Sequence, residues 1–203
     1  MSVAAHTERM AELRADEPSV LIIDDEKRVA DAYALRLKGV TDVTVAYGGE
    51  AALDAVTAAE TPPDVVLIDR HMPGLSGDEV LSELRNADLT TRAVMVTAVD
   101  PELAVLDLPF DDYLCKPVER EDLRAVVDQQ CQVLAFELLG EYFAVESKRA
   151  VIESELRPER LADHDEFDTL TERRGRLRSR VERLHPEAEA LLERFDDIDR
   201  EGY

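Results

Sequence analysis

Residues 20–26 read VLIIDDE, a short apolar run that ends in three acids. An apolar run of this length, without polar alternation, is typical of a strand buried on both faces of a parallel sheet. Similar runs follow it, and amphipathic stretches with helical spacing lie between most of them, at residues 29–37, 51–58 and 79–84. The later runs are Val43–Ala46, Val65–Ile68, Ala93–Val96 and Tyr113–Leu114. This alternation predicts an α/β fold, with five parallel strands in a flavodoxin-like, doubly wound sheet.

Polar side chains gather where these predicted strands end. Asp24 and Asp25 end the first strand, Asp69 the third and Thr97 the fourth, and Lys116 follows the fifth. In open α/β sheets, ligands bind outside the carboxyl ends of the strands, where the strand order reverses. We therefore expect these five residues to form one site. The alternative, in which they are turn residues in surface ion pairs, leaves their convergence on one edge unexplained.

The residue types at this edge suit phosphoryl chemistry. Crowded carboxylates repel, which raises the pKa of at least one of them, unless a cation relieves the conflict. Mg²⁺ takes oxygen ligands, typically one or two carboxylates together with phosphate oxygens. Lys116 supplies a second positive charge for a phosphoryl oxygen, and Thr97 can donate a hydrogen bond to another. Such a site lets a carboxylate attack phosphorus and form an acyl phosphate.

Residues 18–120 resemble the receiver domains of two-component response regulators. The motifs that carry the resemblance are Ile23–Glu26, Ile68–Gly74, Val96–Ala98 and Tyr113–Pro117. The resemblance implies that Asp69 is the phosphoacceptor and that a sensor histidine kinase is the phosphodonor. It also implies that Asp24, Asp25, Asp69 and the backbone carbonyl of His71 bind Mg²⁺. Thr97, Lys116 and Tyr113 would contact the phosphoryl group or switch, and Pro117 would follow a cis peptide.

The segment between Thr97 and Tyr113 departs from the family's usual pattern. The interval from Thr97 to Tyr113 is shorter than usual and contains Pro101 and Pro109. A short fourth helix is therefore expected. A phosphatase with an aspartyl nucleophile would carry a second acid where this chain has His71, and the sequence contains no G-x-x-x-x-G-K-[ST] loop. We therefore expect a signalling protein that catalyses only its own phosphorylation and dephosphorylation, not an enzyme.

The character of the chain changes after Pro117. Residues 118–157 contain no proline and one glycine, which predicts one or two long helices. Apolar residues then recur every seven positions, at Leu170, Leu177, Leu184, Leu191 and Ile198, with Val181, Ala188 and Phe195 as companions. This spacing predicts a helical hairpin or coiled coil, which Pro186 should kink or restart without changing the phase. The predicted domains are a flexible segment 1–18, a receiver 19–120 and a helical output region 121–203. That last region resembles the HalX domain of haloarchaeal regulators.

Six arginines raise the question of DNA binding: Arg173, Arg174, Arg176, Arg178, Arg180 and Arg183. They lie along both edges of the leucine stripe, where arginine stems cover apolar surface and pair with acids. Acidic partners are available at Glu137, Glu141, Glu146, Glu153 and Glu155. Output through self-association or a helical protein partner is therefore favoured. A DNA-binding transcriptional regulator remains the alternative, although phosphate-driven binding weakens steeply in salt.

The net charge of −22 carries information about the solvent. Only four of the 24 basic residues are lysines. Molar salt shortens the Debye length to about 3 Å, so charge repulsion on such a surface largely disappears. The composition resembles proteins of salt-loving archaea, and an ordinary acidic cytosolic protein is the alternative. The chain shows no secretory leader and no apolar run of the roughly 20 residues that a membrane helix needs, so we expect a cytoplasmic protein without a membrane partner.

Overall fold

The computed structural model of the protein describes residues 17–87, 89–98, 107–155 and 164–196. It contains two compact units, residues 1–131 and 132–203. Most of the predicted flexible segment 1–18, most of the short fourth helix expected between Thr97 and Tyr113, and Ile198 lie outside the described residues.

The first unit is built on a five-stranded parallel sheet with the strand order β2-β1-β3-β4-β5. The strands are β1 (Ser19–Ile23), β2 (Asp42–Ala46), β3 (Val65–Ile68), β4 (Arg92–Thr97) and β5 (Asp112–Cys115). Each predicted apolar run falls inside one of them. The predicted fold class, a flavodoxin-like doubly wound sheet, is therefore confirmed.

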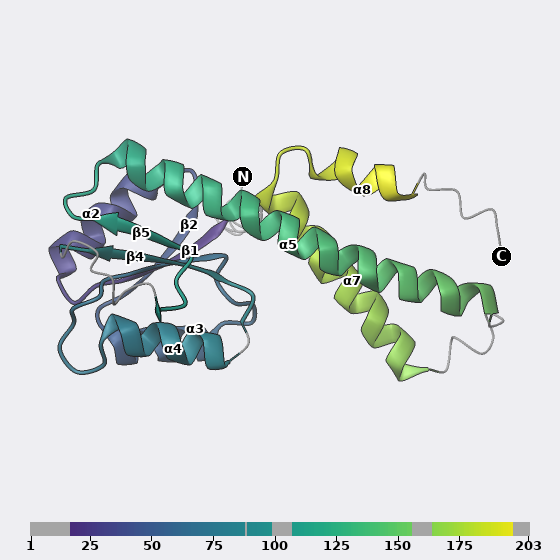
Figure 1. Cartoon of the computed structure of the whole chain (residues 1–203), viewed down its shortest axis with the longest axis horizontal. Coiled ribbons are helices and arrows are strands. Elements are labelled where there is room, and N and C mark those ends of the chain that lie inside the picture. The colour runs from purple at the N-terminus through teal and green to yellow at the C-terminus, as the bar shows by residue number, and fades with distance from the viewer. Residues whose placement is uncertain (1–16, 88, 99–106, 156–163, 197–203) are drawn as a thin grey trace, which may run out of the picture. The chain divides into compact units, whose positions relative to one another are not determined.

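Helices cover both faces of this sheet (Figure 1). They are α2 (Lys27–Leu37), α3 (Gly49–Ala58), α4 (Gly77–Asn86) and the first part of α5 (Arg120–Glu155). Helices α3 and α4 lie on one face, and α2 and α5 lie on the other (Figure 1). The central strands β1, β3 and β4 are therefore buried on both faces, which explains why their sequences are almost continuously apolar. Residues of the edge strands β2 and β5 are partly exposed.

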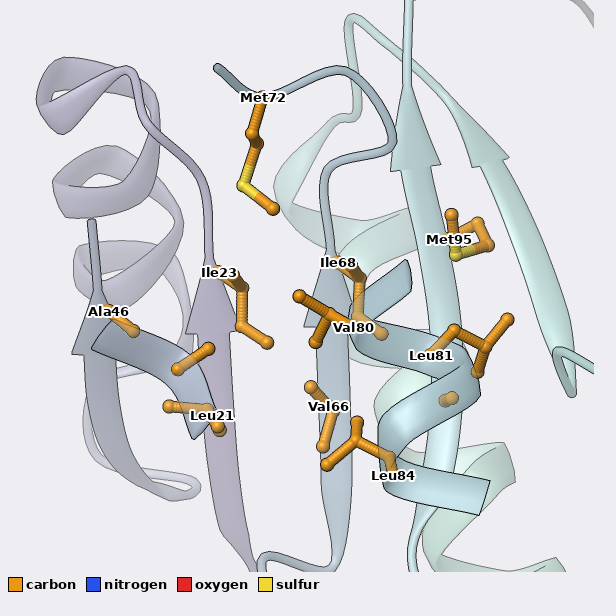
Figure 2. Packing of buried hydrophobic residues seen from close by; sticks show 12 residues of the cluster. Leu21, Ile23, Ala46, Val66, Ile68, Met72, Val80, Leu81, Leu84 and Met95 are labelled. Atoms are coloured by element: carbon orange, nitrogen blue, oxygen red, sulfur yellow. The ribbon is translucent and has the colours of Figure 1, made fainter. Parts of the chain in front are cut away.

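One buried cluster fixes α4 against the sheet. Val80 and Leu84 of α4 lie against Val66 and Ile68 of β3, and Leu81 lies toward β4, as Figure 2 shows. Each of these side chains is almost fully excluded from solvent. Burying a side chain of this size contributes about 1.5–3 kcal/mol, so the start of α4 and the loop before it are held firmly at the carboxyl end of β3.

The second unit is helical, as predicted. It contains residues 132–155 of α5, then α7 (Asp165–Leu184) and α8 (Ala188–Asp196). Their buried side chains include Leu134, Leu138, Tyr142 and Val145 of α5, Leu177, Val181 and Leu184 of α7, and Ala188 and Leu192 of α8. The core of this unit therefore draws on all three helices.

The break at Pro186 restarts the helix, which is one of the two predicted outcomes. Helix α7 ends at Leu184 and α8 begins at Ala188. Across the break, Val181 and Ala188 lie seven positions apart and are both buried, which agrees with the predicted phase, whereas Leu191 is only half-buried and Leu192 beside it is buried.

The arginines of α7 make ion pairs within the second unit. Arg173 pairs with Glu141 at 3.1 Å, and Arg174 pairs with Glu146 and lies over the ring of Tyr142. Arg178 pairs with Glu182 on its own helix at 2.8 Å. Two of the acidic partners predicted on α5 are therefore confirmed. None of the described helices is both long enough and apolar enough to cross a bilayer.

Candidate metal and phosphoryl site

Backbone hydrogen bonds continue one residue past the strands and align the residues that follow them. The Asp69 amide donates to the Ile23 carbonyl at 2.8 Å, and the Asp24 amide donates to the Ala46 carbonyl at 3.2 Å. In the same way, the Lys116 amide donates to the Thr97 carbonyl at 2.8 Å. The parallel register therefore brings the polar residues that end β1, β3 and β4, and the lysine after β5, to one edge of the sheet.

Three carboxylates meet at this edge. Asp24, Asp25 and Asp69 each offer an oxygen atom, and these oxygens lie within 4.8 Å of one another. Asp24 is 2% exposed and Asp69 is 7% exposed, whereas Asp25 is half-buried. Within the described ranges, no other three acids, histidines or cysteines come together in this way. We call these three residues with Lys116 the acidic site.

Lys116 supplies the positive charge of the acidic site. Its Nζ atom lies 2.8 Å from Asp24 Oδ2 and 3.3 Å from Asp69 Oδ2, and its side chain is 13% exposed. Burial disfavours the charged form of this lysine, but the hydrogen bond with Asp24 and the charge of Asp69 outweigh burial and raise its pKa. Lys116 is therefore held as a cation between the two buried carboxylates.

Burial raises the pKa of Asp69, and the nearby charge of Asp24 raises it further, while Lys116 lowers it. The acidic site contains three carboxylates and one ammonium group, which pairs with Asp24 and Asp69, so negative charge remains in excess. Oxygen ligands with excess negative charge suit a hard divalent cation, so the residues present fit Mg²⁺. The side chain of His71 is exposed, and a role for its backbone carbonyl as a further ligand stays a prediction.

The predicted switch residues lie on the two strands nearest Lys116. Thr97 is buried at the end of β4, beside Cys115 in the register of β5. Tyr113 lies opposite Met95, is half-buried, and packs its ring 5.6 Å from that of Phe110. The peptide between Lys116 and Pro117 is cis. Cys115, just before Lys116, is exposed, while Cys131 on α5 is buried.

The loop after Asp69 is held by α4. A side-chain carbon on Gly77 would lie 2.2 Å from the backbone carbonyl oxygen of Asp69, so only glycine fits there without movement. The Ser76 hydroxyl accepts from the Glu79 amide, and the Ser76 amide donates to Glu79 Oε2 at 2.9 Å, which forms a capping box at the start of α4. Arg70 donates to both carboxylate oxygens of Asp78. These contacts fix the backbone on the carboxyl side of Asp69.

A second polar cluster lies at the amino ends of β4 and β5, and it was not predicted. The buried Gln130 of α5 accepts a hydrogen bond from Arg92 and donates one to Asp112. Asp111 forms ion pairs with Arg92 and Arg85. A signal for Gln130 exists in the sequence. It is a polar residue three positions after Val127 and four before Leu134, and therefore on the apolar face of the helix. Its partners on other strands have no comparable signal.

Two family models match the chain. The model described as the response regulator receiver domain matches residues 20–128, and the HalX domain model matches residues 132–201. The receiver match covers more than half of the chain and includes every residue of the acidic site.

Individual relatives give the same picture. A candidate transcriptional regulator of Haloferax volcanii is 40% identical over 197 residues, which are 92% of this chain and 31% of that protein. The sensory transduction protein RegX3 of Mycobacterium tuberculosis is 41% identical over 112 residues, 53% of this chain and 48% of that protein. The chain thus spans no more than about half the length of either relative. The Francisella response regulator 1452 receiver domain has a TM-score of 0.52 and 31% identity, covering 56% of this chain and 96% of that structure.

Proposed function

Because this chain belongs to the response regulator receiver family and carries a HalX domain after its receiver, we propose that it accepts a phosphoryl group on Asp69. The donor is a sensor histidine kinase, and the reaction depends on Mg²⁺. The observation that carries the proposal is the convergence of Asp24, Asp25, Asp69 and Lys116, with carboxylate oxygens within 4.8 Å and an ammonium group 2.8 and 3.3 Å from two of them.

Each residue has a distinct part in this chemistry. An oxygen of Asp69 attacks phosphorus, the bond from phosphorus to the donor nitrogen breaks, and the donor histidine leaves with a proton from solvent. Asp24, Asp25 and Asp69 hold the cation, whose charge lets the phosphoryl oxygens approach three carboxylates. Lys116 is placed to pair with a phosphoryl oxygen, and Thr97 to donate a hydrogen bond to another. The protein catalyses only the phosphorylation of its own Asp69 and the later hydrolysis of the acyl phosphate.

The output is a change in association through residues 121–203, either with a second copy or with a helical partner. Ion pairs between α7 and α5 support this proposal, because Arg173 and Arg174 already have carboxylate partners. The names of the relatives support transcriptional regulation as the level at which the output acts. Direct DNA binding by the helical region is the alternative, and it would need arginines other than these two.

The composition supports a salt-rich cytoplasm as the setting. A net charge of −22 is tolerated best where molar salt screens it, and a relative that matches 92% of the chain comes from Haloferax volcanii. We therefore propose a halophilic, cytoplasmic protein.

The test is labelling with acetyl phosphate. Asp69→Asn should abolish the label, because an amide is a far weaker nucleophile than a carboxylate. Asp54→Asn, an equal loss of charge on the exposed face of α3, should leave the label unchanged. Undiminished labelling of the Asp69→Asn variant, or a label stable to acid, would overturn the assignment.

A further inference from the structure

Gln130 lies on α5 with 3% of its surface exposed, and both ends of its amide are hydrogen-bonded. Its Oε1 atom accepts from Arg92 Nε at 2.9 Å, and its Nε2 atom donates to Asp112 Oδ2 at 3.0 Å. Arg92 is the first residue of β4, and Asp112 is the first residue of β5. One side chain therefore joins the helix to two neighbouring strands. Because the amide is buried, the folded protein loses stability if either of its two hydrogen bonds is not made.

Asp112 connects this amide to the predicted switch residue Tyr113. The other carboxylate oxygen of Asp112, Oδ1, accepts from the Tyr113 backbone amide at 2.8 Å. A displacement of the Tyr113 backbone would therefore act on the same carboxylate that holds Gln130.

The start of β4 is anchored independently. Asp111 Oδ1 pairs with Arg92 Nη1 at 3.1 Å, and Asp111 Oδ2 accepts from Arg85 of α4 at 2.7 Å and from the Ala93 amide at 2.6 Å. Because Arg92 is tied into this set of contacts, it gives Gln130 one fixed partner. Asp112 is the partner that responds to β5.

Strand β5 places the acidic site and Gln130 at its opposite ends. Lys116 follows its last residue, and Asp112 is its first. At a rise of about 3.3 Å per residue, about 13 Å of strand separates the two. Gln130 is also the penultimate residue of the first unit, and α5 continues from there to Glu155.

From this arrangement we propose that Gln130 is the positioning residue through which the state of β5 sets the packing of α5 where it enters the HalX region. The inference rests on the proposed phosphorylation of Asp69. When Lys116 and Tyr113 respond to the phosphoryl group, Asp112 moves with them. Gln130 then either follows Asp112 or gives up one of its two hydrogen bonds, and in both cases the packing of α5 changes.

The experiment compares hydrogen exchange of residues 132–155 in the full chain before and after phosphorylation by acetyl phosphate, in molar KCl. In the wild-type protein, phosphorylation should change this exchange. Gln130→Leu should still be labelled at Asp69 but should lose most of the phosphorylation-dependent change. Gln129→Leu is the matched control, because the neighbouring Gln129 is exposed, and it should respond as the wild type does. A merely structural loss would alter exchange equally in both states and leave the difference intact.

Two further variants exchange the amide of residue 130 with the carboxylate of residue 112. They test the proposal without the loss of packing that Gln130→Leu could cause. Gln130→Glu sets a carboxylate against Asp112 and should also lose the response. Combined with Asp112→Asn, the new amide can donate to the new carboxylate, which still accepts from Arg92, and the response should return.

The outcomes separate the two proposals. If the wild-type protein is not labelled at Asp69, the proposed function fails, and this inference fails with it. If labelling is normal but residues 132–155 do not respond, or if Gln130→Leu keeps the full response, only the role of Gln130 is overturned.

Discussion

The Nζ atom of Lys116 lies 2.8 Å from Asp24 Oδ2, although 92 residues separate the two in the chain. The same atom lies 3.3 Å from Asp69 Oδ2, so one ammonium group holds two buried carboxylates together. The acidic site is therefore organised by its own side chains.

Replacing this lysine tests its part in the reaction. Lys116→Met should slow labelling by acetyl phosphate about tenfold or more, because a hydrogen bond to a charged group contributes about 1.5–3 kcal/mol and 1.4 kcal/mol corresponds to a factor of ten. Lys38→Met, the same change at an exposed position, is the control and should be labelled at the wild-type rate. Equal rates for the two variants would show that Lys116 does not assist phosphoryl transfer.

Removing the cation should stop the reaction. Labelling should cease in excess chelator and in the double variant Asp24→Asn/Asp25→Asn, since the acidic site holds three carboxylates and one ammonium group. Added Mg²⁺ should restore labelling of the wild-type protein and not of the variant. Equal labelling rates with and without chelator would refute the metal requirement.

Gly77 should be sensitive to a single added methyl group. Gly77→Ala places a carbon atom 2.2 Å from the Asp69 carbonyl oxygen, which forces the backbone apart and should cost about 1–3 kcal/mol of unfolding free energy. Labelling at Asp69 should also slow, because the displaced carbonyl belongs to the proposed phosphoacceptor residue. Gly140→Ala in α5 meets no atom within 4 Å and should instead stabilise by about 0.5–1 kcal/mol. Thermal unfolding measures both, and equal effects would contradict the contact.

The capping box at the start of α4 predicts a pH dependence. Ser76→Ala should cost about 1 kcal/mol at neutral pH. The hydrogen bonds from the Ser76 side chain and backbone lower the pKa of Glu79 below its usual 4.5. A lowered carboxylate pKa stabilises the folded state above the unfolded value, and this stabilisation is lost as the pH falls through the folded value. The difference in unfolding free energy between the wild type and Ser76→Ala should therefore become smaller in acid.

The control for this prediction is Ser82→Ala, because the Ser82 hydroxyl donates to the backbone carbonyl of Asp78 and not to a titratable side chain. Denaturant unfolding at neutral pH and below pH 4.5 measures the differences. If the difference in unfolding free energy between the wild type and Ser76→Ala stays constant over this pH range, the capping box is not the origin of that difference.

A structural feature could be predicted from the sequence where a local pattern of residues indicates it, and not where it depends on contacts between distant segments. The sheet and the acidic site were predictable, because Asp24, Asp69 and Lys116 each follow an apolar run, and parallel strands bring such ends together. The contacts of Gly77 and Gln130 were not predictable, because each depends on how closely two elements approach in space. The restart of the helix at Pro186 was one of two predicted outcomes, because proline can either kink a helix or end it.

The output prediction concerns the second unit. Phosphorylation should change self-association or partner binding through residues 124–199, measured by sedimentation in molar KCl. Leu177→Asp/Leu184→Asp should abolish the change, because burying two carboxylates among apolar side chains disrupts the helical core. Ser179→Asp, on the exposed face of α7, should behave as the wild type does. Unchanged association together with binding to a specific DNA site at that salt would favour the arginine-mediated alternative.

The contrast between exposed Cys115 and buried Cys131 makes the native protein suitable for optical measurement. A thiol-reactive fluorophore should attach first to Cys115, which immediately precedes Lys116, without any engineered cysteine. Emission from that dye would follow the carboxyl end of β5 in real time, in the same solution in which the phosphodonor is mixed with the protein.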